Sequence, residues 1–540
     1  MRPFDVCGPL PEKTVVLEAS AGTGKTYTIA ALAARYVAEG TADLSQLMLV
    51  TFSRAATQEL RERVRERLVS AARGLGDPMT ARQQADDDVL RLLAQVDDDE
   101  VRRRQARLTR ALTEFDAATI ATTHGFCQQM LTGLGMAGDS DADATFVERV
   151  DDLVSEVVSD LYLRKFARPG AAAPAIEYDV ARQVARAAMA DRHASLVPED
   201  ADAGSPAGLR YGIARMVRDE VDRRKRLRRL LDYDDLLTRL RDALVHPERG
   251  PAAQERVRSR YRVVLVDEFQ DTDPVQWEIL RTAFHGHRTL VLIGDPKQAI
   301  YAFRGADLVT YLRAPAEADA HFTLSRNWRS DPGLVRGLDA VLRRAALGHG
   351  DVAVRPVEAA QTAQRLTGAP CDVPVRLRVV PRADLELTKG GLGSTPDAQR
   401  FVAEDVAADV VGLLGSDAVL TLEGAPRPVA PGDIAVLVKT NDQAALVRDQ
   451  LYDAGVPAVI AGSKSVFLTR PATDWLVLLR AVEQSHRAGL VRSAALTCFV
   501  GWSATRLGTA DEAEVDRLAQ QLRSWRDVLV ARGVAALLRW

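Results

Sequence analysis

Short apolar runs recur in the first 300 or so residues, and each is followed by a polar turn and then a helical pattern. The clearest runs are residues 15–17, 47–50, 263–266 and 290–293. Continuous runs of Val, Ile and Leu are typical of strands that are buried on both faces, as in a parallel sheet covered by helices. The pattern therefore predicts an α/β fold whose functional residues lie just beyond the carboxyl ends of these strands.

From about residue 150 to residue 237 the pattern is helical instead. Its clearest apolar stripe is formed by Val150, Leu153, Val154, Val157, Val158 and Leu161. A second α/β pattern begins near residue 314, with its clearest strand at 433–438, and the chain is helical again from 471. The predicted boundaries are 1–135 with 228–313 for a first α/β domain, 136–227 for a helical insertion into it, 314–470 for a second α/β domain, and 471–540 for a further helical segment.

Composition narrows the class of protein. The net charge of −3 over 540 residues excludes a uniformly basic nucleic-acid-binding chain, so any such site is a local patch or groove. The cysteines, Cys7, Cys127, Cys371 and Cys498, are too far apart in sequence for a metal or redox motif, and we expect free buried thiols. No signal peptide or membrane-spanning run is present, which predicts a cytoplasmic protein without membrane contact.

A phosphate-binding loop is predicted between the first strand and its helix. It consists of Ala19, Ser20, Ala21, Gly22, Thr23, Gly24, Lys25 and Thr26. Glycines let successive backbone N–H groups turn toward phosphate oxygens, and the helix N-terminus adds partial positive charge. Lys25 is placed to reach the β- and γ-phosphates, and the Thr26 hydroxyl to bind Mg²⁺. We therefore expect ATP and Mg²⁺ as ligands.

Further candidate residues follow later apolar runs. Asp267 and Glu268 come directly after residues 263–266, where Asp267 would hold Mg²⁺ and Glu268 would polarise the attacking water. Gln298 follows residues 290–293 and would sense the γ-phosphate. In residues 324–330, Arg329 would reach the γ-phosphate across a cleft from the second domain, and Trp328 would stack on adenine.

Aromatic and cationic side chains alternate at Tyr301, Phe303 and Arg304. Single-stranded nucleic acid needs such a set, because bases stack on rings and phosphates pair with cations. The basic residues 223–229 allow two interpretations, which the sequence leaves open. They either follow a DNA backbone or form a solvated helix face above packed leucines, Leu227, Leu230 and Leu231.

Taken together and in this order, the segments resemble superfamily 1 DNA helicases of the UvrD/Rep class. The likeness rests on the strings AxxGTGKT, VDEFQDTDPVQW, GDPKQAIYAFRGAD and LSRNWRS, which begin at residues 19, 266, 294 and 324. Residues 51–56 (TFSRAA) and 122–127 (TTHGFC) resemble two further motifs of that family. LEASAGTGKTYTIAAL, THGFCQQML, LDYDDLL and residues 433–440 and 465–467 are more similar to the RecB-type members.

The resemblance implies two RecA-like domains with ATP between them, each with a helical insertion, the second one incomplete here. It implies ATP-driven 3′ to 5′ movement on single-stranded DNA, in which Phe52, Tyr301 and Phe303 hold bases. Thr51 and His124 would contact the same strand. RecB-type members work with RecC-like and RecD-like subunits on double-stranded DNA ends in break repair.

The sequence departs from the family pattern in three respects. No counterpart of the later motifs V and VI or of the nuclease cluster is found, so we expect an N-terminal portion without full activity or nuclease activity. No Gln precedes the phosphate loop to clamp adenine, and Ser53-Arg54 replaces the usual pair beside Phe52. Two alternatives remain: a P-loop ATPase with a partner other than DNA, and a non-catalytic piece that binds DNA or docks onto a subunit.

Overall fold

The computed structural model describes residues 1–84, 86–134, 145–147, 149–167, 174–301, 306–345, 347–371, 373–422, 424–462 and 465–537. The chain divides into two compact units. The first unit is Met1–Arg365 with Val373–Arg376, and the second is Leu366–Asp372 with Leu377–Trp540.

A seven-stranded sheet forms the centre of the first unit, and all of its strand pairs are parallel. All four predicted runs are strands in this sheet, which confirms the predicted α/β class for this unit. The strands, in spatial order, are β1 (Arg2–Pro3), β9 (Ala320–Leu324), β2 (Thr14–Ala19), β8 (Thr289–Gly294), β7 (Val263–Val266), β3 (Leu47–Thr51) and β4 (Thr119–Thr122).

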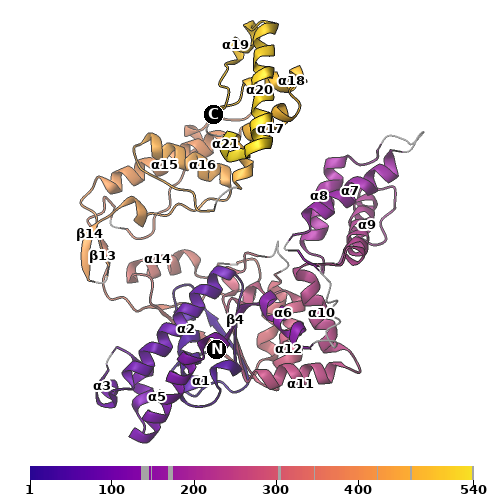
Figure 1. Cartoon of the computed structure of the whole chain (residues 1–540). Coiled ribbons are helices and arrows are strands. Elements are labelled where there is room, and N and C mark those ends of the chain that lie inside the picture. The colour runs from indigo at the N-terminus through magenta and orange to yellow at the C-terminus, as the bar shows by residue number, and fades with distance from the viewer. Residues whose placement is uncertain are drawn as a thin grey trace. The chain divides into compact units, whose positions relative to one another are not determined.

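Helices cover both faces of this sheet (Figure 1). Alternate strand residues enter two separate cores, so that Leu17 and Leu265 face one layer while Val16 and Val264 face the other. The first layer contains α1 (Lys25–Ala38), α2 (Arg54–Gly74), α4 (Asp88–Ala94) and α5 (Asp98–Thr113), with α3 (Pro78–Gln83) beside them. The second contains α6 (Thr123–Leu134), α10 (Tyr233–Val245), α11 (Gly250–Arg260), α12 (Pro274–Phe284) and α13 (Leu308–Glu317).

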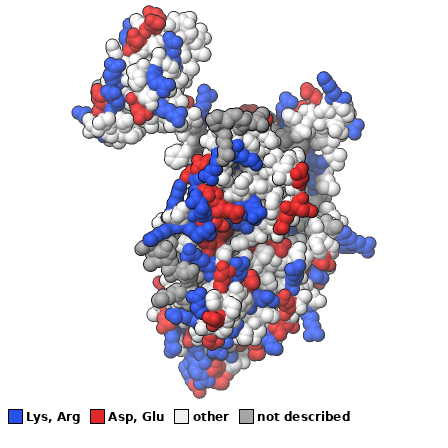
Figure 2. All heavy atoms as spheres, turned by 90° about the vertical axis from the view of Figure 1, so that its right-hand side faces the viewer, with Lys and Arg blue, Asp and Glu red and all other residues white. Residues whose placement is uncertain are grey.

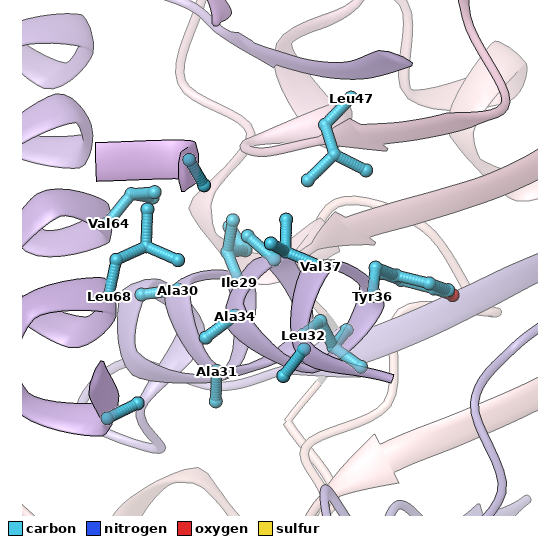
Figure 3. Packing of buried hydrophobic residues seen from close by; sticks show 14 of the residues in the cluster. Ile29, Ala30, Ala31, Leu32, Ala34, Tyr36, Val37, Leu47, Val64 and Leu68 are labelled. Atoms are coloured by element: carbon cyan, nitrogen blue, oxygen red, sulfur yellow. The ribbon is translucent and has the colours of Figure 1, made fainter. Parts of the chain in front are cut away.

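Helix α1, which begins at the phosphate loop, is anchored by small and apolar side chains. Alanines let it lie close to the sheet and to α2, where Val64 and Leu68 pack against it (Figure 3). The Tyr36 hydroxyl donates to the Pro11 carbonyl at 2.6 Å, and Gly40, in the left-handed region at φ 77°, follows the helix end. The start of α1 is therefore fixed relative to the strand that precedes it.

Between α6 and α10 lie three helices, α7 (Asp151–Phe166), α8 (Tyr178–Ala190) and α9 (Pro206–Leu227), with a small apolar core of their own. Two short strands, β5 (Thr145–Phe146) and β6 (Leu230–Leu231), pair in parallel at their base. After β9 the first unit continues with β10 (Arg326–Asn327), α14 (Pro332–Leu342) and β11 (Glu358–Ala359).

The second unit contains helices and one small antiparallel sheet. The sheet is formed by β12 (Leu366–Thr367), β13 (Val419–Leu422) and β14 (Ala425–Pro428). Helices α15 (Thr395–Leu414) and α16 (Asn441–Asp453) share one core. Helices α17 (Arg470–Glu483), α18 (Ala488–Ala495) and α20 (Glu512–Arg532) share another, with α19 (Ala504–Thr509) and α21 (Val534–Leu537) beside them.

The predicted start of a second α/β domain at residue 314 is wrong. Strand β9 lies beyond that boundary, yet it pairs along its whole length with β2, from Ala320 opposite Val15 to Leu324 opposite Ala19. Without β9, one edge of β2 would have open backbone groups, which parallel sheets avoid. The apolar pattern predicts that a strand forms but does not say which sheet it joins.

The strand predicted at residues 433–438 does not form among the residues that the structure describes. Residues 434–438 form no ladder within the described part of the second unit, and Leu437 is 95% exposed. A run of apolar residues becomes a strand only when neighbouring backbone groups pair with it, and the described residues supply none here.

Free cysteines were expected, and all four are free thiols, but their predicted burial holds only for Cys127. Cys371 and Cys498 are exposed, and Cys7 is half-buried. In the described residues, no helix combines the length and apolar character that crossing a bilayer requires.

The central strands should dominate the stability of the first unit. Leu265 in β7 is fully buried between helical layers, whereas Leu227 at the end of α9 is mostly exposed. We expect Leu265→Ala to lower the free energy of unfolding by about 2–5 kcal/mol and Leu227→Ala by no more than about 0.5 kcal/mol. Denaturant titration followed by circular dichroism measures both, and equal losses would contradict this assignment of the core.

Candidate functional site

The phosphate loop joins the end of β2 to the start of α1. Gly22 and Gly24 have φ values of 78° and 87°, in the left-handed region that favours glycine. A Cβ at Gly22 would lie 2.9 Å from the Cβ of Arg329, so a larger residue would not fit. Gly24 caps α1 without a side-chain hydrogen bond, which leaves the first N–H groups of the helix open to an anion.

Lys25 and Glu268 bring the two halves of the site together. The Lys25 Nζ donates to Glu268 Oε2 at 2.8 Å, although the residues are 243 positions apart. Glu268 follows β7 and has φ 52°, an uncommon backbone conformation for a residue with a side chain. Such strain is often kept at functional sites. The phosphate loop and the acidic pair therefore meet at the carboxyl edge of one parallel sheet.

Several carboxylates crowd this edge. Burial, and then the charge of Glu268, raises the pKa of Asp267 to about 6, and the same two causes raise the pKa of Asp271 to about 6. A divalent cation would favour the ionised forms, and hard oxygen donors are its preferred ligands. In the described part of the chain no three His, Cys, Asp or Glu side chains are arranged to hold a metal by themselves. The arrangement fits Mg²⁺ held by one or two protein oxygens together with phosphates and water.

The segment 324–330 lies against the phosphate loop within the first unit. Trp328 N donates to Gly22 O at 2.8 Å, and Asn327 Nδ2 donates to Ala21 O at 3.1 Å. Asn327 Oδ1 also accepts from Arg329 N at 3.0 Å. The expectation that Arg329 approaches from a second domain is therefore wrong, because β9 delivers this segment from the same sheet as β2.

Two exposed aromatic side chains flank the loop. Trp328 is 55% exposed, and its ring lies 3.6 Å from the position that a Cβ on Gly24 would occupy. Tyr27 is 50% exposed, but only its Cβ approaches that position, and its ring lies 5.8 Å from the Arg67 guanidinium. The Arg326 guanidinium is 4.5 Å from the Trp328 ring centroid, which holds the ring by a cation–π interaction. Large exposed rings beside a phosphate site are suited to contact a nucleotide base.

A second group of aromatic residues lies around the ends of β3 and β4. The Phe52 and Tyr301 rings are 4.6 Å apart and inclined by 30°. His124 packs edge-on against Tyr233 at 4.8 Å, and the Tyr233 hydroxyl accepts from Arg54 Nη2 at 2.8 Å. Burial lowers the pKa of His124, which favours a neutral ring at neutral pH. Paired rings of this kind offer surfaces on which unpaired bases can stack.

The remaining predicted residues that the structure describes lie at the ends of β3 and β8 and at the start of α1. Thr51 is buried at the end of β3, and its hydroxyl has no hydrogen-bond partner in the described part of the chain. Gln298 donates to Asp295 Oδ2 at 2.7 Å in the loop after β8. Thr26 lies in the first turn of α1. Phe303 and Arg304 lie outside the described residues.

Three residues that the sequence analysis did not single out help to build the site. Asn327 connects residues 324–330 to the phosphate loop, Tyr233 contacts His124 and Arg54, and Gln270 connects Glu268 with Asp295. Each of the three lies inside a motif segment that the sequence reveals, next to residues with a predicted role. Which neighbour each one contacts depends on tertiary packing.

The basic run at 223–229 is mostly engaged in ion pairs, so neither sequence interpretation describes it fully. Arg224 pairs with Glu220, Glu156 and Asp160, and Lys225, which is buried, pairs with Asp232 and Asp235. Leu227 is exposed rather than packed beneath the charges. Basic and acidic atoms are likewise intermixed on the face drawn in Figure 2. These ion pairs connect α9 to α7 and α10. They therefore argue against the interpretation that residues 223–229 follow a DNA backbone.

Known proteins that resemble the chain agree on one family. The family model described as the UvrD/REP helicase N-terminal domain matches residues 6–319. The chain is 50% identical to the RecBCD enzyme subunit RecB of Mycolicibacterium smegmatis, over 99% of the chain and 48% of that protein. The RecB subunits of Mycobacterium tuberculosis and Escherichia coli are 46% and 29% identical, over 100% and 97% of the chain and 48% and 54% of those proteins. The chain thus spans about half the length of these curated relatives.

The buried Asp267 should destabilise the fold when it is ionised. Its folded-state pKa of about 6 lies above the ordinary value of 3.8, so the destabilisation is complete above about pH 6 and absent below pH 3.8. We expect Asp267→Asn to raise the free energy of unfolding at neutral pH, by at most about 3 kcal/mol. The gain should shrink as the pH falls through 6, which denaturant titrations at several pH values measure.

Asp87→Asn is the matched control of opposite sign. At Asp87, burial is outweighed by hydrogen bonds from Arg67, and the pKa is lowered. This variant should lose stability at neutral pH. A variant at Asp267 that is no more stable than the parent at neutral pH would contradict the assigned destabilisation.

Proposed function

The chain belongs to the UvrD/REP helicase family, and on that premise we propose that it is the N-terminal motor portion of an ATP-dependent 3′ to 5′ DNA helicase of the RecB type. The observation that carries the proposal is the contact of Lys25 with Glu268 at 2.8 Å on one parallel sheet. Hydrolysis of a triphosphate needs a phosphate-binding lysine and a water-polarising carboxylate a few ångströms apart. This pair supplies both.

In the proposed site, the turn from Ala19 to Gly24 and the N-terminus of α1 bind the phosphates, and Lys25 exchanges Glu268 for phosphate oxygens. Thr26 and Asp267 hold Mg²⁺, which neutralises phosphate charge. Gln298 senses the γ-phosphate. Arg329, an exposed residue whose Cβ lies close to Gly22, contacts the γ-phosphate from the first unit.

Adenine is proposed to stack on Trp328. This ring is exposed beside Gly24, and Arg326 fixes it from one side. Stacking would partly replace the missing glutamine clamp, although it distinguishes bases poorly because every base has a flat aromatic face.

Single-stranded DNA is proposed to cross the ends of β3 and β4. Phe52 and Tyr301 would hold bases, with Thr51 and His124 beside them. By the resemblance, Phe303 and Arg304 would contact the same strand. The intermixed charges on α9 support a strand held by stacking more than by a basic groove.

The relatives are named as RecB subunits of the RecBCD enzyme. We propose by resemblance that the whole protein works with RecC-like and RecD-like subunits on double-stranded DNA ends. We further propose that α7–α9 are the insertion of the first RecA-like domain, and that the second unit contributes to a second RecA-like domain and its insertion. Two rival assignments, a P-loop ATPase without a DNA partner and a non-catalytic docking piece, predict different results for ATP hydrolysis and DNA binding.

Nucleotide binding and hydrolysis test the carrying observation. Lys25→Ala should weaken Mg·ATP binding about 10- to 100-fold, because a charged hydrogen bond to phosphate contributes about 1.5–3 kcal/mol. Glu268→Gln should keep that affinity and lose hydrolysis. Calorimetry and phosphate release measure the two effects, and the exposed Lys13→Ala is the control. Hydrolysis is compared in the whole protein, and Mg·ATP binding without hydrolysis there would favour the non-catalytic assignment.

DNA binding separates a helicase from another P-loop ATPase. The double variant Phe52→Ala with Tyr301→Ala should weaken binding of a fluorescent oligo-dT at least about tenfold, because each stacked base contributes about 1–3 kcal/mol. Tyr452→Ala, an exposed aromatic residue of the second unit, should leave it unchanged. Unchanged oligo-dT affinity in the double variant would favour the ATPase without a DNA partner.

A further inference from the structure

An unbroken series of hydrogen bonds connects the phosphate-loop lysine with the loop that follows β8. Lys25 Nζ and Gln270 Nε2 both donate to Glu268 Oε2, each at 2.8 Å. Asp295 N donates to Gln270 Oε1 at 2.9 Å, and Gln298 Nε2 donates to Asp295 Oδ2 at 2.7 Å. We call these five residues, Lys25, Glu268, Gln270, Asp295 and Gln298, the Gln270 relay. They span the site from the phosphate loop to the segment that leads into Tyr301.

Gln270 is the central member, and the chemistry of its position requires a primary amide. It lies in the short turn Phe269–Asp271 and is only 2% exposed. Its NH₂ group donates to Glu268 at 2.8 Å and more weakly to Asp271 Oδ2 at 3.3 Å, and its oxygen accepts from Asp295 N. A flipped amide would set two donors against each other. A glutamate would offer only acceptors and would add charge beside Glu268, and an asparagine would be one carbon too short to keep both contacts.

Close packing around Gln270 leaves the side chains of the Gln270 relay little room to move independently. A Cβ on Gly294, at the end of β8, would lie 2.8 Å from Gln270 Oε1 and 3.0 Å from Tyr311 Cε2. Phe269, next to Gln270, packs against Trp277 and Tyr311. Because close-packed interiors transmit displacements, movement of the Gln270 amide moves the backbone at Asp295 as well.

We propose that Gln270 is a positioning residue that couples nucleotide occupancy to single-stranded DNA affinity. The proposal rests on the nucleotide and DNA sites proposed above. Lys25 and Gln270 share one oxygen of Glu268, so when Lys25 turns to phosphate oxygens, Gln270 becomes the remaining donor to that oxygen. Its altered position is passed through Asp295 to Gln298, and from there to the loop that carries Tyr301 against Phe52.

The test measures coupling between two binding equilibria. The affinity for a fluorescent oligo-dT is determined with and without a slowly hydrolysed ATP analogue and Mg²⁺, and the affinity for the analogue with and without oligo-dT. In the parent chain we expect each ligand to change the affinity of the other by the same factor, on the order of tenfold. In Gln270→Met, which keeps the volume and loses the three polar contacts with Glu268, Asp271 and Asp295, the factor should fall to about one while each separate affinity stays near that of the parent.

Gln270→Glu is the second variant, in which a carboxylate oxygen can still accept the hydrogen bond from Asp295 N. It loses the donor to Glu268, so it should lose the coupling as well, even if Gln270→Met proves unstable. Gln276→Met, a change at another buried glutamine, is the matched control and should keep the factor of the parent.

The possible failures are distinguishable. Parental coupling in a folded Gln270→Met or Gln270→Glu variant would overturn the relay and leave the proposed function standing. A parent chain that binds no Mg·nucleotide, or no oligo-dT, would overturn the proposed function and the relay together. A parent chain that binds both ligands without mutual effect would overturn the relay alone.

Discussion

The ion pair between Lys25 and Glu268 holds together two segments that the chain separates by 243 positions. Asp267 and Asp271 lie near it, and both have a pKa raised to about 6 by burial and by the charge of Glu268. Lys25 opposes this accumulation of negative charge, and its ammonium lowers the pKa of both aspartates. Where the phosphate loop and the acidic turn meet, this one contact offsets the local negative charge, and a bound Mg·triphosphate would take over that electrostatic role.

That contact exists because the strands carrying the two segments belong to one sheet. Strand β8 separates β2 from β7 and pairs with both in parallel, so their carboxyl ends reach the same edge. On the other side of β2, β9 brings Trp328 and Arg329 to the phosphate loop. The triphosphate, base and DNA contacts proposed here therefore all lie on the first unit.

The ion pairs of α9 agree with the proposal that a DNA strand is held by stacking rather than by a broad basic surface. The basic residues of α9 pair with Glu156, Asp160 and Asp232, among other acids, and so connect helices to one another. The Phe52–Tyr301 and His124–Tyr233 ring pairs lie instead at strand ends near the nucleotide site. A strand held by such rings responds to small displacements of the loop that carries Tyr301, and such a displacement is what the Gln270 relay would produce.

By itself the sequence determined the four buried strands, the turn around Gly22 and Gly24, and the family, because these depend on local apolar periodicity, glycine conformation and short motifs. Only the tertiary structure decided that residues 320–324 complete the first sheet, that residues 434–438 pair with no strand among the described residues, and that Gln270 lies between Glu268 and Asp295. The physical reason is that strand partnership and side-chain hydrogen bonds join residues far apart in sequence. A one-dimensional pattern records which groups are present but not which of them meet.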